Sequence, residues 1–223
     1  CGLHRSDIPV KWRGLDLHSG EVAVPEGVLE NEFCYVVGED GYESCGRVLC
    51  RNRHGFLKPV GSYSRGIQGV RPQDDNQRMA LDVLLDPDIS LVALVGPAGA
   101  GKNILTIAAG LDALQNGDVT SIMYVKPIVP VGGRDIGFLK GDKDEKLWSW
   151  VKPLFDNLRV IGMNGRKQWD EETMLDDGQL ELEALTFMRG RTLHGYWVIL
   201  DETQNLSRKE VITALSRMGE KTK

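Results

Sequence analysis

A short glycine-rich stretch offers the clearest chemistry in this sequence. It reads Gly96-Pro97-Ala98-Gly99-Ala100-Gly101-Lys102 and fits the phosphate-binding pattern G-x-x-x-x-G-K. In such a loop, backbone N–H groups surround phosphate oxygens at the start of a helix, and the lysine adds a mobile positive charge. The pattern usually continues with Ser or Thr, whose hydroxyl binds the magnesium ion of a nucleotide, but Asn103 stands here.

Two adjacent carboxylates form the second group of chemical interest. Asp201 and Glu202 follow the apolar run of "YWVILDETQN", which is typical of a strand ending at the ligand-binding edge of a parallel sheet. We expect Asp201 to hold magnesium, directly or through water, and Glu202 to orient an attacking water. An acidic pair after a strand can also be a solvated loop, but its combination with the phosphate loop favours the functional interpretation.

Asn103 leaves open whether this site hydrolyses a bound nucleotide. Its amide oxygen can ligate magnesium, but it is neutral and lies on a longer side chain than that of Ser. Magnesium requires close octahedral geometry, so we expect nucleotide to bind with weakened metal coordination and slower hydrolysis. The alternatives are a site that binds nucleotide with little turnover and a glycine-rich turn without a ligand.

The elements that must position these groups alternate between strands and helices. Such an order predicts a parallel sheet with helices on both faces. The run 89–95 is continuously apolar, which is typical of a strand buried on both faces. The remaining predicted elements are helix 102–116 ended by Gly117, strand 120–125, helix 143–158 with a kink near Pro153, strand 195–201, and a helix with Ser207 as N-cap and Glu210 in a capping box.

Residues 1–72 have a different pattern from residues 73–223. The first part contains short strand-like runs, for example 31–40 and 45–52, separated by Gly, Pro, Asn and Asp. This pattern predicts a small β-rich domain, a barrel or sandwich, followed by a linker. The second part begins with a predicted helix in 74–86 and contains the phosphate loop. We therefore expect two domains with a boundary near residue 72.

Composition narrows the class of protein. The 223 residues are 41% hydrophobic and 26% charged, with a net charge of −5, which argues against a strongly basic nucleic-acid-coating module. No apolar run approaches the roughly 18 residues of a membrane span, so we expect a cytoplasmic protein without membrane contact. The first residue is Cys1 rather than Met, which suggests a segment of a longer protein.

The cysteines allow two interpretations. A zinc site could combine Cys45, Cys50 and His54, with Cys34 as a further ligand, but the spacing is irregular and contains no CxxC pair. Reduced thiols in a cytosolic protein are the simpler interpretation.

Several motifs in order resemble one family. "GPAGAGK", "KPIVPVGGRDIGFLKGD", "DEKLWSWVKPLFDNL", "FMRGRTL" and "VILDETQNLSRKEVITALSRMGEKTK" follow the order and spacing of the PhoH-like ATPases, and most closely the branch in which an RNA-cutting PIN domain precedes the ATPase. The resemblance is strong over residues 65–223 and loose before them. It implies a P-loop NTPase fold of the RecA or helicase type, ATP and Mg²⁺ as ligands, and a coupling of ATP hydrolysis to RNA unwinding or remodelling. It also implies single-stranded RNA as a partner, a homo-oligomer such as a hexameric ring, and a PIN nuclease domain in the parent protein.

The resemblance implies roles for further polar residues. Gln77 would read the adenine edge, or would be an ordinary solvated helix residue. Gln204 would sense the γ-phosphate, or would be an ordinary loop residue. Arg189 and Arg191 would supply charge to the transition state, in cis or to a neighbouring subunit, or would form surface ion pairs instead. Three more residues stand where helicase-like proteins contact the nucleic-acid backbone, although exposed charges are usually only solvated: Arg134, Asp135 and Lys140.

The sequence also departs from the family pattern. The family favours Thr where Asn103 stands, Arg where Lys126 stands, Pro at Lys140 and Ala at Thr203, and "VPVGGRD" has one extra glycine. The chain ends before the strand that normally follows, so we expect an ATPase domain truncated at its C-terminal end. Asn103 and the missing downstream strand favour an alternative function, a nucleotide-binding regulatory module with little hydrolysis.

A third hypothesis assigns RNA binding to residues 1–72. Small barrels bind single strands through aromatic side chains and a basic groove. The alternative is that these aromatic side chains form the core of the domain. The candidates are Phe33, Tyr35, Tyr42, Phe56, Tyr63, Arg47, Arg51, Arg53 and His54.

Overall fold

The computed structural model describes most of the chain and divides it into two compact units. The described residues are 6–10, 22–24, 26–38, 48–127, 143–165, 169–185, 188 and 191–223. The first unit consists of Cys1–Tyr63 and Pro72–Asp82, and the second of Ser64–Arg71 and Val83–Lys223. The predicted domain boundary at residue 72 stays a prediction. Most of α1 (Asp75–Leu84) belongs to the first unit, which includes Pro72–Asp82.

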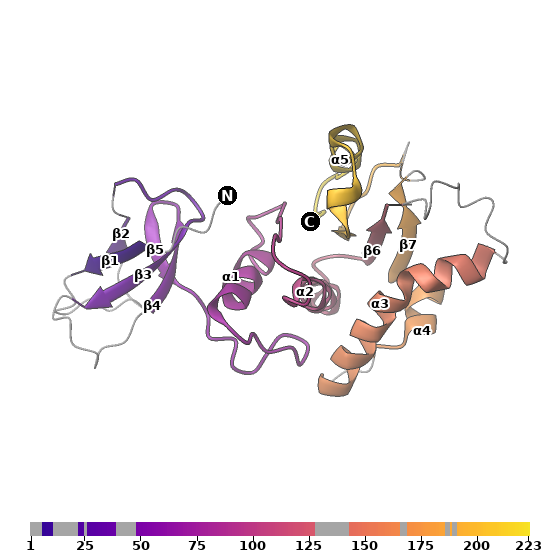
Figure 1. The fold of residues 1–223 in the computed structure, drawn as a ribbon, viewed down its shortest axis with the longest axis horizontal. Coiled ribbons are helices and arrows are strands. Elements are labelled where there is room, and N and C mark those ends of the chain that lie inside the picture. Colours follow the sequence, from indigo (N-terminus) through magenta and orange to yellow (C-terminus); the bar gives the residue numbers. More distant parts are fainter. Residues whose placement is uncertain are drawn as a thin grey trace. The chain divides into compact units, whose positions relative to one another are not determined.

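The first unit contains a five-stranded sheet in the order β1-β3-β4-β5-β2 (Figure 1). Its strands are β1 (Ser6–Val10), β2 (Val22–Ala23), β3 (Phe33–Gly38), β4 (Val48–Arg53) and β5 (Phe56–Pro59). Neighbours β3, β4 and β5 are antiparallel, and β1 runs parallel to β3. Short strands joined by turns therefore form the predicted β-rich part.

One face of this sheet forms a small core. Cys34, Val36, Cys50 and Leu57 are buried together, because alternate side chains of a strand point to the same face. Cys34 and Cys50 lie directly opposite each other in the β3–β4 register.

The sheet of the first unit is tied to α1 by charged and polar contacts. The Nε atom of Arg51 lies 2.7 Å from Oδ2 of Asp82, and the hydroxyl of Tyr35 donates a 2.6 Å hydrogen bond to Asp75. Arg78 on the helix donates back to the carbonyl of Val60 at 3.1 Å. These contacts hold α1 against strands that precede it by many residues in the chain.

The second unit contains a three-stranded parallel sheet in the order β7-β6-β8. The strands are β6 (Ser121–Lys126), β7 (Leu180–Ala184) and β8 (Tyr196–Leu200). The helices are α2 (Lys102–Asn116), α3 (Lys143–Asn164), α4 (Glu171–Asp176) and α5 (Arg208–Leu215). The predicted parallel arrangement of the second part is confirmed. Neither β7 nor α4 was predicted from the sequence.

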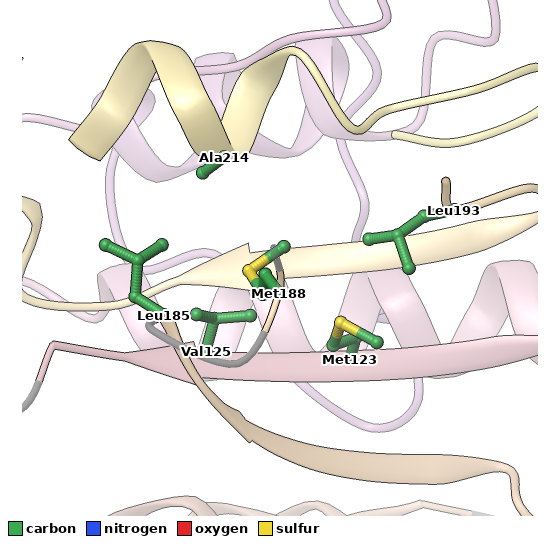
Figure 2. Close-up of a cluster of buried hydrophobic side chains, with 6 residues drawn as sticks. All are labelled: Met123, Val125, Leu185, Met188, Leu193 and Ala214. Carbon is green, nitrogen blue, oxygen red and sulfur yellow. The ribbon is translucent and has the colours of Figure 1, made fainter. Parts of the chain in front are cut away.

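Helices α2 and α5 cover opposite faces of this sheet. Met123 and Val125 of β6 pack against Ala214 of α5, together with Leu193 and other residues (Figure 2). On the opposite face, Trp197 of β8 lies against Gly110 of α2, so closely that a Cβ atom at Gly110 would lie 2.6 Å from the indole ring. Since successive strand residues alternate in direction, Tyr124 points to the face covered by α2.

Helix ends agree with the sequence signals. Gly117 ends α2 in the left-handed conformation, with a φ of 78°. Ser207 and Glu210 form the predicted capping box of α5. Pro153 lies inside α3.

No helix in the described part of the chain has the length and apolar composition of a membrane span.

The prediction of a buried strand at 89–95 is wrong. The segment Leu91–Val95 forms no strand, and Leu91 and Val95 are 63% and 98% exposed. A strand buried on both faces needs neighbours in its sheet, and no described strand pairs with this segment. The outer edge of β8 forms hydrogen bonds with Lys223 instead. The N–H of Val198 donates to the Lys223 carbonyl at 2.7 Å, and the N–H of Lys223 donates to the Tyr196 carbonyl at 2.9 Å.

Candidate functional site

The phosphate loop leads directly into α2. Gly99 and Gly101 have φ angles of 78° and 81°, a region that favours glycine, and Gly101 is the N-cap of the helix. No side chain caps this helix end within the described residues. The N–H groups of the first turn, which have no partner inside a helix, can therefore bind an anion.

Lys102 is folded back onto the loop. Its Nζ atom donates hydrogen bonds of 2.8 Å to the carbonyls of Gly96 and Pro97. A phosphate group entering the loop would compete with these two carbonyls for the ammonium group. The two neutral carbonyls therefore hold the ammonium group of Lys102 close to the loop.

Asp201 is the meeting point of three parts of the second unit. It follows β8, and its N–H donates to the Val125 carbonyl of β6 at 3.0 Å. The Nδ2 atom of Asn103, at the start of α2, lies 3.2 Å from its Oδ2 atom and donates to it. The Nζ atom of Lys126, at the end of β6, lies 3.8 Å from the same oxygen. The eighth residue of the phosphate pattern and the first carboxylate after β8 are therefore in direct contact.

Tyr124 also binds Asp201, and the sequence analysis did not identify it. Its hydroxyl donates a short hydrogen bond to Oδ2 of Asp201, while its ring is buried on the α2 face of the sheet. Burial, and then the hydrogen bond to Asp201, raise the pKa of Tyr124 far above its ordinary value, so the phenol stays protonated and acts as a donor. The run "SIMYVK" contains no signal for this role, because a tyrosine in a buried strand is usually an ordinary core residue.

Glu202 differs from Asp201 in its exposure. It has a φ of 52° at the start of the short 3-10 turn Thr203–Asn205, and its side chain is exposed. Its N–H donates to Oδ1 of Asp201 at 2.9 Å, and the amide of Gln204 donates to its carboxylate. Gln204, expected to sense the γ-phosphate, thus contacts the residue expected to orient water.

The residues around Asp201 fit a magnesium ion bound together with a nucleotide. Magnesium is held in such sites by one or two carboxylates, phosphate oxygens and water rather than by a full set of protein ligands. Asp201 supplies the carboxylate, and the Oδ1 atom of Asn103 supplies a neutral oxygen, since Nδ2 is the atom that faces Asp201. Lys126 is the one unfavourable neighbour in this group, because its ammonium lies near the same carboxylate.

Other residues with predicted roles are less closely tied to this site. Gln77 belongs to the first unit, where its side-chain oxygen accepts from the N–H of Gln73 at 2.7 Å. Arg191 forms ion pairs with Glu181 and Glu183 of β7 at 3.1 and 3.5 Å, which favours the ion-pair alternative for this arginine. Four residues with predicted roles lie outside the described residues: Arg134, Asp135, Lys140 and Arg189.

The predicted RNA contacts of the first unit are partly wrong. Phe33, Tyr35 and Arg51 are buried, because they pack in the sheet or against α1, so they do not form an exposed binding surface. Phe56 and Tyr63 are half-buried and His54 is exposed. Tyr42 and Arg47 lie outside the described residues.

The cysteines behave as buried thiols. Cys34 and Cys50 are free, and burial raises their pKa to about 11 and about 12. Cys45 of the possible zinc site lies outside the described residues. Within the described part, no group of three His, Cys, Asp or Glu side chains is arranged to hold a metal ion.

The second unit combines a parallel sheet with a glycine-rich loop that leads into a helix beside a strand-end aspartate. These features define a P-loop NTPase-like α/β protein. A family model described as "PhoH-like protein" matches residues 69–223. The chain belongs to the PhoH-like family.

Relatives with curated descriptions agree with this assignment. "Protein PhoH2" of Bacillus subtilis is 42% identical over 197 residues, which cover 86% of this chain and 44% of the relative. "Protein PhoH2" of Mycolicibacterium smegmatis is 41% identical over 70% of this chain and 35% of the relative. "PhoH-like protein" of Mycobacterium bovis is 33% identical over 90% of this chain and 52% of the relative. The chain therefore spans about half, or less, of the length of these relatives.

Proposed function

We propose that the chain binds ATP with Mg²⁺ and hydrolyses its β–γ phosphate bond. The observation that carries this proposal is the 3.2 Å hydrogen bond between Asn103 and Asp201. It joins the helix that follows the phosphate loop to the carboxylate after β8, which supports a site in which phosphate and metal would be bound side by side.

The phosphate tail would be bound by the loop from Gly96 to Gly101 and by the first N–H groups of α2. Lys102 would exchange its two carbonyl partners for phosphate oxygens, which is favourable because an ammonium binds an anion more strongly than a neutral carbonyl. The donors are already oriented before the reaction, so they would stabilise the transition state without reorganisation.

Asp201 and Asn103 would hold the magnesium ion, which supplies charge neutralisation on the phosphates when it is bound. Glu202 would orient the attacking water, since it is the exposed carboxylate beside Asp201. Gln204 would keep Glu202 in place through the hydrogen bond between their side chains. Arg189 would add charge to the transition state, and Gln77 would read the adenine edge; both roles follow from the family resemblance. Arg191 would instead keep its ion pairs with Glu181 and Glu183.

Asn103 would make turnover slow. Its amide donates to Asp201 where a Ser or Thr hydroxyl would bind the metal more closely. Asn103→Thr is therefore expected to raise the rate of phosphate release, and an unchanged rate would contradict this explanation. The alternative function is a nucleotide-binding regulatory module, which would bind ATP and release little phosphate.

RNA unwinding or remodelling is proposed for the whole protein rather than for this segment. The family resemblance supports single-stranded RNA as the partner, a homo-oligomer such as a hexameric ring as the assembly, and a PIN nuclease domain in the parent protein. The cytoplasmic location expected from the sequence stays a prediction. Stimulation of ATP hydrolysis by single-stranded RNA, tested on the parent protein, measures the coupling directly.

The test of the proposed function is magnesium-dependent phosphate release from ATP. Lys102→Ala and Glu202→Gln are expected to lower the rate by about 100-fold or more. Loss of one preorganised donor that stabilises charge costs about 10²–10³-fold, and a positioned group that assists proton transfer contributes about 10²–10⁴-fold. Arg159→Met is the matched control, because it removes an exposed ion pair with Glu171 away from the loop. ATP binding without release would favour the regulatory module, and absence of binding would refute both functions.

A further inference from the structure

The hydrogen bonds of Asp201 are divided unequally between its two oxygens. Oδ2 accepts from Asn103 and from the Tyr124 hydroxyl and lies 3.8 Å from Nζ of Lys126. Oδ1 accepts from the N–H of Glu202. A carboxylate has about four lone-pair positions in total, two on each oxygen. Oδ2 is therefore saturated by protein donors, whereas Oδ1 retains room for another partner.

Tyr124 is the most rigidly held of these donors. It lies on β6, the middle strand of the sheet, opposite Ile199 of β8, and it is 2% exposed. Within the described residues, its hydroxyl has one hydrogen-bond partner, Asp201. Lys126 is a long side chain at the strand end with a longer contact, and Asn103 stands at the first turn of a helix. The phenol thus fixes the position of Oδ2 relative to the sheet itself.

We infer that Tyr124 is a positioning residue for Asp201. By holding Oδ2 together with Asn103, Tyr124 would leave Oδ1 as the oxygen available to a magnesium ion that accompanies ATP. This role rests on the proposed nucleotide-binding function. The usual pattern places a Ser or Thr hydroxyl at the position of Asn103, whereas in this chain the hydroxyl beside Asp201 comes from Tyr124 of β6.

A purely structural role for Tyr124 has a different consequence. If the hydroxyl only satisfied a buried polar group, its loss would lower thermal stability and leave the metal dependence of nucleotide binding unchanged. The two roles are therefore separated by titrating magnesium rather than by measuring activity.

The experiment is equilibrium binding of a fluorescent, non-hydrolysable ATP analogue to the full chain at a series of magnesium concentrations, and again in EDTA. Tyr124→Phe keeps the ring and removes the hydroxyl. We expect it to raise the half-saturating magnesium concentration about 10-fold or more, as loss of an outer-shell partner does at metal sites, and to leave binding in EDTA unchanged. Circular dichroism at the assay temperature verifies that the variant is folded.

Tyr196→Phe is the matched control. The Tyr196 hydroxyl also donates to a carboxylate, that of Glu181 at 2.7 Å, but it stands at the other end of β8. We expect the half-saturating magnesium concentration of Tyr196→Phe to stay within about twofold of the wild-type value, because this hydrogen bond does not orient a proposed metal ligand. In an Asp201→Asn background, Tyr124→Phe should have no further effect, because Tyr124 acts through Asp201.

The outcomes separate the two proposals. If the wild-type chain binds nucleotide and Tyr124→Phe shows the same magnesium dependence, the role of Tyr124 is overturned and the proposed function is not. An additive effect of Tyr124→Phe in the Asp201→Asn background overturns it as well. Failure of the wild-type chain to bind the analogue at any magnesium concentration overturns the proposed function, and the role of Tyr124 with it.

Discussion

The ion pair between Arg51 and Asp82 gives the sharpest prediction about the first unit. Arg51 lies on β4 and is 1% exposed, and its Nε atom is 2.7 Å from Oδ2 of Asp82 on α1. The hydroxyl of Tyr63 donates to the other oxygen of Asp82 at 3.3 Å. Replacing Arg51 by Met keeps most of the side-chain volume and removes the positive charge that Arg51 places beside Asp82.

The size of the effect follows from burial. Removing one partner of a buried ion pair costs about 3–5 kcal/mol, because the other charge stays in a poorly solvated position. Domains are stable by only about 5–15 kcal/mol, so Arg51→Met should remove a large part of the free energy of unfolding of this unit. Adding Asp82→Asn should recover part of the loss, since the amide is neutral and its oxygen still accepts from Tyr63.

Hydrogen exchange of β4 and α1 amides is the appropriate assay, because a chain with two units need not unfold in one step. Arg159→Met is again the control: its 2.8 Å ion pair with Glu171 has an arginine that is 65% exposed, and such pairs contribute about 1 kcal/mol or less. The reasoning is refuted if Arg51→Met costs no more than Arg159→Met, or if Asp82→Asn gives no recovery.

Three further predictions concern packing, thiol reactivity and pH. Gly110→Ala should lower the melting temperature by a few degrees, because its methyl group would lie 2.6 Å from the Trp197 ring and overpacking costs about 1–3 kcal/mol; differential scanning calorimetry should show a smaller effect in a Trp197→Leu background. In a Cys1→Ser/Cys45→Ser variant, the native thiols of Cys34 and Cys50 should react with a thiol reagent at pH 8 far more slowly than in urea, and rapid native reaction would contradict their burial. Their folded-state pKa values, about 11 and about 12, lie above the ordinary 9.0, so the unfolded chain releases protons first and stability should fall as pH rises from about 9 toward 12.

Features that depend on neighbouring residues could be predicted from the sequence. The capping box of Ser207 and the left-handed Gly117 end their helices through contacts within one turn, and such contacts leave a local pattern. Alternation of strands and helices likewise predicted the parallel sheet, because a parallel connection requires a crossover. The phosphate loop could also be predicted, because its glycines adopt backbone conformations that few other residues adopt.

Features that depend on distant partners could not be predicted in this way. The run 89–95 has the composition of a buried strand, but a strand exists only where another strand offers hydrogen bonds. The sequence of β7 alternates leucine with Glu181 and Glu183, and acidic residues are unfavourable in strands. In the folded unit these two glutamates are stabilised by Arg191 and Tyr196, which come from later parts of the chain.

The role inferred for Tyr124 depends on the register between β6 and β8. Tyr124 lies opposite Ile199, and Val125 lies opposite Leu200. This register places the phenol on the α2 face, where Asn103 lies in the first turn of the helix. A shift of one residue would exchange the two faces of β6, so that Val125 would point toward α2 and Tyr124 toward α5. All five residues of β6 from Ser121 to Val125 are buried, so no alternation along this strand fixes its register. The hydroxyl that contacts Asp201 is therefore set by the pairing of strands and by the packing of both helices, and not by any motif around Tyr124.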